Sequence, residues 1–190
     1  MRTRPRSLIL KGKKIVLRPL FPRDVSATWV SWLNDPEVNE FLEARFRKST
    51  MESERAFAKS FDQKTRFLWG IFDKKTGKHI GTITLYDIHP AHKYANYGYL
   101  IGNKKYWGTG AVQEAIALVF DFAFLKSSVH SISTGAYAPN VASVFNYKKM
   151  GLRPEGVRKE HLLLKGKFVD EVLYGITKKE WVAYRRRLKL

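Results

Sequence analysis

Short runs rich in apolar and aromatic residues, bounded by polar turns, predict about seven strands along the chain. The first is Ile15–Pro19 (IVLRP), and the others are predicted at 66–72, 80–87, 95–101, 131–136, 157–164 and 168–176. Polar turn residues that include Gly separate 66–72 from 80–87, and Lys165-Gly166-Lys167 joins the last two strands. Connections this short imply an antiparallel meander over 66–101 and a hairpin near the end of the chain.

Helical spacing of apolar residues predicts helices on the segments between these strands. Trp29, Trp32 and Leu33 recur at this spacing, and both tryptophans are expected in the core. Ser49 and Glu52 fit a capping box at the start of a helix. The predicted helices lie at about 27–33, 36–43, 51–62, 111–125, 140–150 and 178–188.

The order of these elements predicts the fold class. Helix 111–125 lies between strands 95–101 and 131–136, which forms a βαβ unit within an otherwise antiparallel pattern. We therefore expect an α/β (α+β) fold with a mixed, mostly antiparallel sheet of about six or seven strands and helices on both faces. The length of 190 residues fits one domain, predicted at 14–190 after a basic tail at 1–13.

The chain is strongly basic, with a formal net charge of +18. Much of this charge lies near the ends, at Arg2, Arg4, Arg6, Lys11, Lys13, Lys14, Arg185, Arg186, Arg187 and Lys189. Such a surface fits simple solubility, a nucleic acid, a ribosome or a small polyanionic ligand. Charge alone does not choose among these partners.

Several classes of chemistry are excluded by composition. The absence of Cys excludes disulfides, thiolate metal sites and a cysteine nucleophile. The five His residues form no metal-spaced pair such as HExxH, so no metal is expected. No apolar run approaches the roughly 18 to 20 residues of a membrane helix, and the first residues lack the apolar block of a signal peptide. We expect a cytoplasmic protein that does not interact with membranes.

Two glycines, Gly108 and Gly110, lie between strand 95–101 and helix 111–125. A helix N-terminus exposes N–H groups without intrahelical partners, and its dipole adds partial positive charge. Glycine permits positive φ and removes Cβ atoms that would keep a phosphate away. Lys104 and Lys105 add charge nearby. The segment fits a diphosphate site, although neither GxxxxGK[ST] nor GxGxxG is present and Gly-x-Gly alone also fits an ordinary tight turn.

A second segment, Asn140 to Leu152 (NVASVFNYKKMGL), makes the pattern more specific. Together the two segments resemble the GNAT superfamily of acyl-CoA N-acyltransferases. That family has a Q/R-x-x-G-x-G/A loop, in which Lys105 here replaces Gln or Arg. Further along the chain it has an Asn. Counted from that Asn, a small residue follows at three positions, a Tyr at seven, a Lys at nine and Gly-Phe at eleven. The corresponding residues here are Asn140, Ser143, Tyr147, Lys149 and Gly151-Leu152, with only the final Phe changed.

The rest of the chain is similar to one branch of that family. IVLRPLFPRDV and WLNDPEVNEFLEARF resemble the opening of the ribosomal-protein alanine acetyltransferases and the amino-sugar N-acetyltransferases, and KGKFVDEVLYGI resembles their closing hairpin. The resemblance spans about 14–181. It implies an N-acetyltransferase that moves the acetyl group of acetyl-CoA directly to a primary amine in a ternary complex.

The resemblance also implies where acetyl-CoA binds. In this family the fourth strand carries a bulge and splays from the fifth, and the acyl donor lies in the resulting slot. The pantetheine arm pairs with strand backbone at the slot edge and is bonded by the Asn, while the diphosphate lies on the loop amides. The implied cofactor-binding residues are Tyr99, Leu100, Ile101, Lys105, Gly108, Thr109, Gly110, Ala111, Val112, Asn140 and Ser143.

The resemblance makes Tyr147 the general acid that protonates the departing sulfur. A phenol has a pKa near 10 and therefore holds a proton that it can donate at neutral pH. From the residues alone, Tyr147 is more typical of a core position on an amphipathic helix.

The resemblance makes Asn96 the second catalytic candidate. Many relatives carry Glu or Asp at this strand position, and an amide does not accept a proton usefully. Asn96 is therefore expected to orient the amine or a water molecule. Glu43, Asp87, His89 and His92 are open alternatives for a base acting through water, although each also fits a surface position. The missing carboxylate favours an acceptor amine of low pKa, such as a protein N-terminus, an amino sugar or a small amine.

The acceptor is expected to contact the early helices and the final hairpin. Asn34 and Glu43 are the candidate substrate residues, and a loop cap and a solvated charge explain them equally well. Acetyl-CoA, an amine acceptor and a ribosomal or other acidic partner are the expected partners of a monomer or homodimer. The alternative function is a basic nucleic-acid- or ribosome-binding protein that keeps the fold without catalysis, although the chain has no RNP, KH or zinc-finger pattern.

Overall fold

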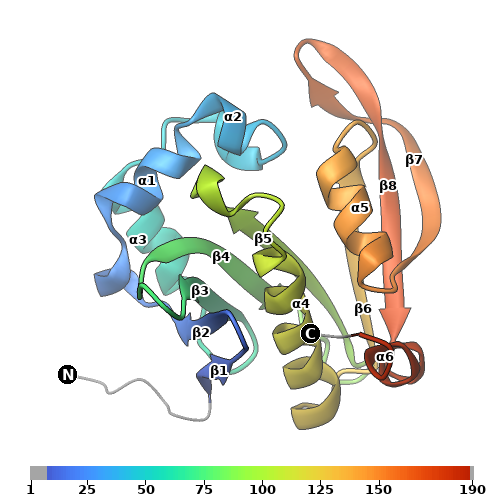
Figure 1. Ribbon diagram of the computed structural model, residues 1–190. Helices are drawn as coiled ribbons and strands as arrows, with labels where there is room; N and C mark the ends of the chain where they lie inside the picture. The colour runs from blue at the N-terminus through green and yellow to red at the C-terminus, as the bar shows by residue number, and fades with distance from the viewer. Residues whose placement is uncertain (1–7, 189–190) are drawn as a thin grey trace.

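The computed structural model describes residues 8–188 and contains one mixed sheet with helices on both faces (Figure 1). Within this range the sheet has eight strands in the order β1-β2-β3-β4-β5-β6-β8-β7. The strands are β1 (Leu10–Lys11), β2 (Ile15–Pro19), β3 (Phe67–Asp73), β4 (His79–Tyr86), β5 (Tyr94–Ile101), β6 (Ser131–Tyr137), β7 (Arg153–Leu164) and β8 (Lys167–Thr177). The helices are α1 (Ala27–Leu33), α2 (Pro36–Asn39), α3 (Met51–Lys59), α4 (Ala111–Asp121), α5 (Val141–Lys149) and α6 (Lys178–Arg185).

The predicted meander and closing hairpin are confirmed. Strands β2 to β5 pair antiparallel in sequence order, and β7 pairs antiparallel with β8. Short polar connections explain this arrangement, because a tight turn can only return the chain beside the strand it has just left. The central βαβ unit is confirmed as well, since β5 and β6 are parallel and are connected through α4.

The parallel pairing of β5 with β6 is short. It covers only Tyr94↔Ser131, Ala95↔Ile132 and Asn96↔Ser133, so the two strands separate beyond Asn96. The pairing of β4 with β5 continues without a register shift from Gly81↔Ile101 to Tyr86↔Asn96. The bulge expected on β5 is therefore absent from this pairing. The strands instead separate where the β5–β6 ladder ends, and this separation between β5 and β6 beyond Asn96 is called the slot.

Apolar side chains form a core on each face of the sheet. One face packs α1 to α3 against the sheet, with Trp29 and Trp32 buried as predicted. The other face packs α4 to α6, and its largest buried side chains include Phe120, Phe124 and Trp181. Figure 1 shows α1, α2 and α3 on one side of the molecule and α5 with β7 and β8 on the other. Within residues 8–188, no helix is long and apolar enough to cross a membrane.

The N-terminal boundary differs from the prediction. Residues 1–7 of the predicted tail lie outside the described residues, but Leu8 and Leu10 are buried and β1 pairs with β2. The indole N–H of Trp69 donates to the Leu8 carbonyl at 2.8 Å. A two-residue strand gives no readable alternation, so the sequence pattern could not reveal β1.

The cap of α3 is also shifted by one residue from the prediction. Thr50 and Ser53 form the capping box, and Ser49 instead donates its backbone N–H to the Asn34 side-chain oxygen at 2.9 Å. The side chains of Thr177 and Glu180 form the capping box that opens α6.

Candidate active site

The Gly-rich loop delivers free amides at the start of α4. Gly108 and Gly110 have φ of +72° and +87°, the left-handed region that favours glycine. Among the described residues, no acceptor bonds the backbone N–H of Gly108, Gly110 or Val112. A Cβ at Gly108 would meet nothing within 4 Å, and one at Gly110 would meet only the Gln113 oxygen at 3.8 Å. The loop therefore presents unpaired donors to open space, the chemistry of an anion site.

Residues around the loop fix its shape. The Thr109 hydroxyl donates to the Tyr106 carbonyl at 2.8 Å, and the Ala111 N–H donates to the same hydroxyl oxygen at 3.4 Å. The indole N–H of Trp107 donates to the Ile101 carbonyl at 2.8 Å. These bonds tie the loop to the end of β5, so the glycines stay beside the slot.

The charge beside the loop differs from the prediction. The Lys104 ammonium forms ion pairs with Asp35 at 2.8 Å and Glu37 at 2.5 Å, so two carboxylates of the α2 segment offset its charge. Lys105 is exposed, and no partner of its ammonium occurs within the described range. The cation that does contact the loop is Lys14, whose ammonium donates to the Thr109 carbonyl at 3.4 Å. Sequence reasoning missed Lys14 because it lies 95 positions away in the chain.

The edge of β5 faces the slot through alternate residues. The Thr134 hydroxyl of β6 donates to the Tyr97 carbonyl at 3.2 Å, so the carbonyl of Tyr97 faces β6. Backbone groups alternate along a strand, so those of Tyr99 and Ile101 face the same way. The Leu100 carbonyl lies against Gly81 of β4. The backbone groups of Tyr99 and Ile101 therefore face away from β4, and the Leu100 carbonyl faces β4.

Helix α5 lines the other side of the slot. The Asn140 side-chain oxygen caps the helix by accepting the Ser143 N–H at 3.0 Å. Tyr99 donates its hydroxyl to Ser143 at 3.2 Å and accepts the Asn146 amide at 3.0 Å. Asn146 in turn accepts the Gln113 amide of α4 at 2.6 Å. This chain of bonds couples β5, α5 and the first turn of α4, and the sequence pattern gave no signal for its Gln113–Asn146 part.

Tyr147 lies at the closed end of the slot. Its hydroxyl donates to the Gly135 carbonyl at 3.3 Å and lies 3.3 Å from the Thr134 hydroxyl. Thr134 directly follows Ser133, the last β6 residue that pairs with β5. Its ring is 5% exposed and packs against those of Tyr97 and Tyr174. Burial raises the pKa of Tyr147 well above its usual value, and the nearby Tyr99 acts in the same direction. The phenol is therefore neutral and holds its proton at physiological pH.

Asn96 pairs with a carboxylate. Its side-chain amide donates to Asp87 at 3.3 Å, and Asp87 lies just after β4 with φ of +51°. Of the four open alternatives for a base, Asp87 is therefore the one in contact with Asn96. His89 accepts the N–H groups of Ala91 and His92 within its own turn.

The early helical segment and the final hairpin, which are expected to contact the acceptor, lie together. Glu43 accepts the Tyr137 hydroxyl at 3.0 Å, and Arg45 donates to that hydroxyl and to the Leu163 carbonyl at 2.8 and 2.6 Å. Asn34 lies nearby, but its amide group is bonded to backbone groups of Val30 and Ser49. A substrate contact by Asn34 or Glu43 stays a prediction.

A depression of about 580 Å³ lies between these two segments. Its cationic lining residues are Arg45, Arg47, Lys48 and Lys165, and the single carboxylate among its lining residues is Glu40. Glu40 forms an ion pair with Lys165 at 2.5 Å. Among residues 8–188, no group of three or more His, Asp or Glu side chains could hold a metal ion.

Comparisons with known proteins point to one family. Residues 14–153 match the family described as Acetyltransferase (GNAT) domain. The chain is 28% identical over 173 residues to Uncharacterized N-acetyltransferase YoaA of Bacillus subtilis (strain 168), covering 90% of this chain and 97% of that protein. It is 28% identical over 124 residues to the [Ribosomal protein uS5]-alanine N-acetyltransferase of Escherichia coli (strain K12), covering 65% of this chain and 63% of that protein.

Solved structures show the same fold. Spermidine N-acetyltransferase from Vibrio cholerae, in complex with CoA and spermine, superposes with a TM-score of 0.80 at 20% sequence identity. The match covers 90% of this chain and 99% of that one.

Proposed function

The chain belongs to the GNAT acetyltransferase family, and from this premise we propose that it acetylates a primary amine of low pKa, a protein N-terminal amine or an amino sugar. The protein is an acyl-CoA-dependent N-acetyltransferase, and acetyl-CoA is its acyl donor. The transfer is direct, within a ternary complex of enzyme, donor and acceptor. The comparisons give no support to the alternative of a nucleic-acid- or ribosome-binding protein without catalysis.

One arrangement supports the proposed mechanism: unpaired amides lie where the chain passes from β5 into α4, and a protonated phenol lies where the ladder between β5 and β6 ends. The amides of Gly108, Gly110 and Val112 would bind the diphosphate, and the backbone of Tyr99 and Ile101 would pair with the pantetheine arm. Tyr147 lies where β5 and β6 separate, the place such a donor would present its thioester.

The proposed reaction begins with attack of a neutral amine on the thioester carbonyl. A C–N bond forms, and the tetrahedral intermediate then collapses as its C–S bond breaks. The electron pair of that bond leaves with sulfur, which takes the Tyr147 proton. The surplus proton of the amine passes to solvent, or to Asp87 through a water molecule that Asn96 orients. The Tyr147 phenolate then takes a proton from solvent.

The environment of Asn96 supports an acceptor of low pKa. An α-amino group has a pKa near 7.7 to 8.0, so an appreciable fraction is neutral at pH 7, whereas a lysine at about 10.4 is almost wholly charged. A site with an amide at this position and an exposed carboxylate beside it suits the first kind of amine. The similarity to an enzyme named for the alanine of ribosomal protein uS5 supports a protein N-terminus.

The depression between the early helical segment and the final hairpin is positively charged. This supports an acceptor that carries negative charge away from its reactive amine. Arg47 and Lys48 line the depression without a carboxylate partner among the described residues. A ribosomal or other acidic partner fits this surface, as does a nucleotide-linked amino sugar. A monomer or homodimer located in the cytoplasm completes the proposal.

An acceptor screen that follows free thiol release from acetyl-CoA tests this proposal. The panel contains a peptide with an N-terminal alanine, a nucleotide-linked amino sugar, a polyamine and an aminoglycoside, and the N-acetylated peptide is the blank. We expect turnover with the peptide or the amino sugar. Turnover with the polyamine alone, or release with no acceptor preference, would contradict the proposed acceptor class while leaving the family assignment intact.

A further inference from the structure

The turn between β1 and β2 reaches the Gly-rich loop. The Lys14 ammonium donates to the carbonyl of Thr109, the residue between the two glycines, at 3.4 Å. Within residues 8–188 no carboxylate lies within ion-pair distance of this ammonium, and Lys14 is exposed. An unneutralised cation therefore lies beside the free loop amides.

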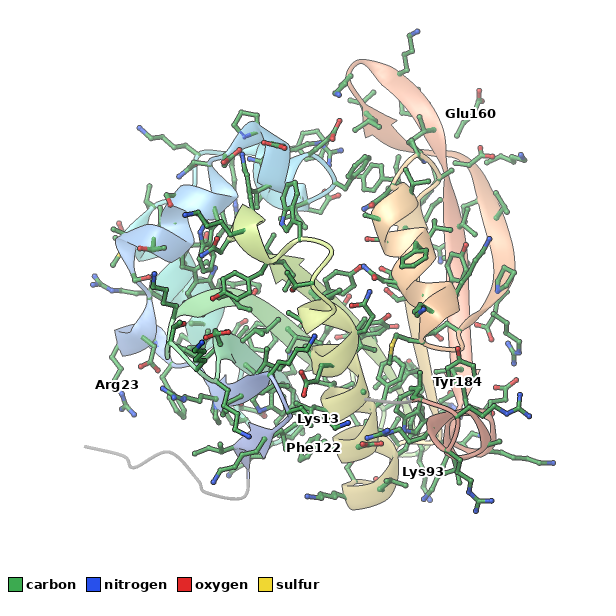
Figure 2. All side chains as sticks on the ribbon, viewed as in Figure 1. Lys13, Arg23, Lys93, Phe122, Glu160 and Tyr184 are labelled. Carbon is green, nitrogen blue, oxygen red and sulfur yellow. The ribbon has the colours of Figure 1, made fainter. Side chains whose placement is uncertain are left out.

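A buried carboxylate holds this turn in place. Glu114, in the first turn of α4, is only 6% exposed. Its two oxygens accept the Lys14 backbone N–H at 3.2 and 3.1 Å, and one of them also accepts the Lys13 N–H. Figure 2 shows Lys13 of this turn beside α4. Because hydrogen bonds to a charged group are strong, Glu114 fixes the turn relative to the loop.

Gly12 permits this close approach. A Cβ at position 12 would overlap the Glu114 carboxylate, so either that carboxylate or the turn would have to shift. The Gly12 N–H donates to the Ile15 carbonyl at 2.9 Å, which closes the turn. On its other side the Lys74 ammonium donates to the Gly12 carbonyl at 3.1 Å. The turn is thus held both by α4 and by the connection between β3 and β4.

The surroundings of the turn are strongly positive. A depression of about 430 Å³ beside it is lined by Lys13, Lys14, Asp73, Lys74 and Lys75. Lys104, the lysine expected to supply charge at the loop, already forms ion pairs with two carboxylates. Among the described residues, Lys14 thus supplies an unpaired positive charge beside the Gly-rich loop, whereas the charge of Lys104 is offset by two carboxylates.

We propose that Lys14 is a phosphate-binding residue of the acetyl-CoA site and that Glu114 is the residue that positions it. The Lys14 ammonium would bind a phosphate group of CoA together with the amides of Gly108 to Val112. The phosphate is either the diphosphate or the 3′-phosphate, and the two share the same chemistry. This inference rests on the proposed placement of the diphosphate at the loop.

The test measures dissociation constants by calorimetry for CoA and 3′-dephospho-CoA with the full chain. Lys14→Met removes a charge-assisted bond and should raise the dissociation constant of CoA about tenfold. The increase should be larger at low ionic strength than at high. Lys14→Arg should restore affinity to within about threefold, because it keeps the charge. An equal loss for both ligands identifies the diphosphate, and a loss confined to CoA identifies the 3′-phosphate.

Lys126→Met is the matched control. It removes the same charge just beyond the C-terminal end of α4. This position is more than about 20 Å along the helix from the Gly-rich loop, so salt screens its interaction with a phosphate there. Its constants should stay within about twofold of the wild type. If Lys14→Met behaves like this control while Gly110→Ala weakens CoA binding, the role of Lys14 is overturned and the loop site stands. If neither variant weakens binding, the loop site itself is wrong.

A double-mutant cycle tests the positioning role of Glu114. Glu114→Gln leaves one acceptor oxygen and turns an amide toward the backbone N–H groups. If Glu114 acts through Lys14, the Glu114→Gln and Lys14→Met variants should weaken CoA binding to a similar degree, and the double variant little further. A purely structural role would lower thermal stability with CoA affinity intact, and additive losses of affinity would also overturn the positioning role. Lys14→Met changes an exposed side chain, so it tests the phosphate contact even if Glu114→Gln does not fold.

Discussion

The hydroxyl of Tyr147 lies 3.3 Å from that of Thr134, one position after the last β6 residue paired with β5. Thr134 also donates to the Tyr97 carbonyl at 3.2 Å, so the phenol is fixed at the closed end of the slot. The ladder between β5 and β6 ends at Asn96↔Ser133, directly before the β6 residues that the Tyr147 hydroxyl contacts.

Tyr147→Phe should lower kcat by about tenfold or more and change acetyl-CoA affinity by less than about twofold. The ring contacts with Tyr97 and Tyr174 remain, and only the proton donor is lost. Steady-state kinetics and direct donor titration measure the two effects. Tyr174→Phe, which removes a hydroxyl from the neighbouring ring, should keep kcat near the wild-type value. An unchanged kcat in Tyr147→Phe would remove the residue from the mechanism.

The raised pKa of Tyr147 also predicts the basic side of the pH profile. Burial favours the neutral phenol, so the acid keeps its proton above the ordinary tyrosine pKa of about 10. The wild-type kcat should therefore show no loss assignable to this acid below about pH 10. A basic limb near neutral pH that disappears in Tyr147→Phe would show that the phenol ionises much earlier.

Gly110→Ala should raise the dissociation constant of acetyl-CoA about tenfold. A φ of +87° costs a non-glycine residue about 1–2 kcal/mol, so the loop shifts and its amides lose alignment. Gly166→Ala is the matched control, because Gly166 has φ of +78° in the β7–β8 turn. It should lose similar stability and bind acetyl-CoA normally. Equal affinities in the two variants would contradict a diphosphate at Gly110.

Asn96→Asp should move the acid limb of the kcat profile to higher pH. The new carboxylate lies beside Asp87, and repulsion between the two charges raises the pKa of the second carboxyl to lose its proton, so the base stays protonated up to a higher pH. Asp87→Asn removes the carboxylate beside Asn96 and should lower kcat, and Glu52→Gln on α3 controls for a lost surface charge. Coincident profiles for Asn96→Asp and the wild type would exclude this position from proton handling.

His79 predicts acid sensitivity of the fold. It packs against Trp29, Trp32 and Phe72, and burial lowers its pKa from 6.5 to about 4. The unfolded chain binds a proton at higher pH than the native one, so the free energy of unfolding falls as pH drops from about 6.5 toward 4, by up to about 3 kcal/mol. His79→Gln should remove much of this pH dependence in urea unfolding. A variant that keeps the full slope would assign it to the carboxylates instead.

The sequence predicted most of the strands and both motif segments, because these depend on neighbouring residues. Short apolar and aromatic runs between polar turns mark β2 to β8, and Gly108 and Gly110 meet a local need for positive φ. The Asn140 cap of α5 likewise bonds a residue three positions away. In each case the physical cause lies within a few residues and is legible from the order of side chains.

Tertiary packing decided the rest. The sequence alone did not show that Lys104 would pair with the α2 segment or that Glu114 would accept amides 100 positions earlier in the chain. A short ladder between β5 and β6 opened the slot without the expected bulge. Local pattern determined which elements form and where the backbone leaves donors unpaired. The contacts between distant elements determined which charges remain free to meet a ligand, because a buried or paired charge finds its partner only when the sheet and helices have assembled.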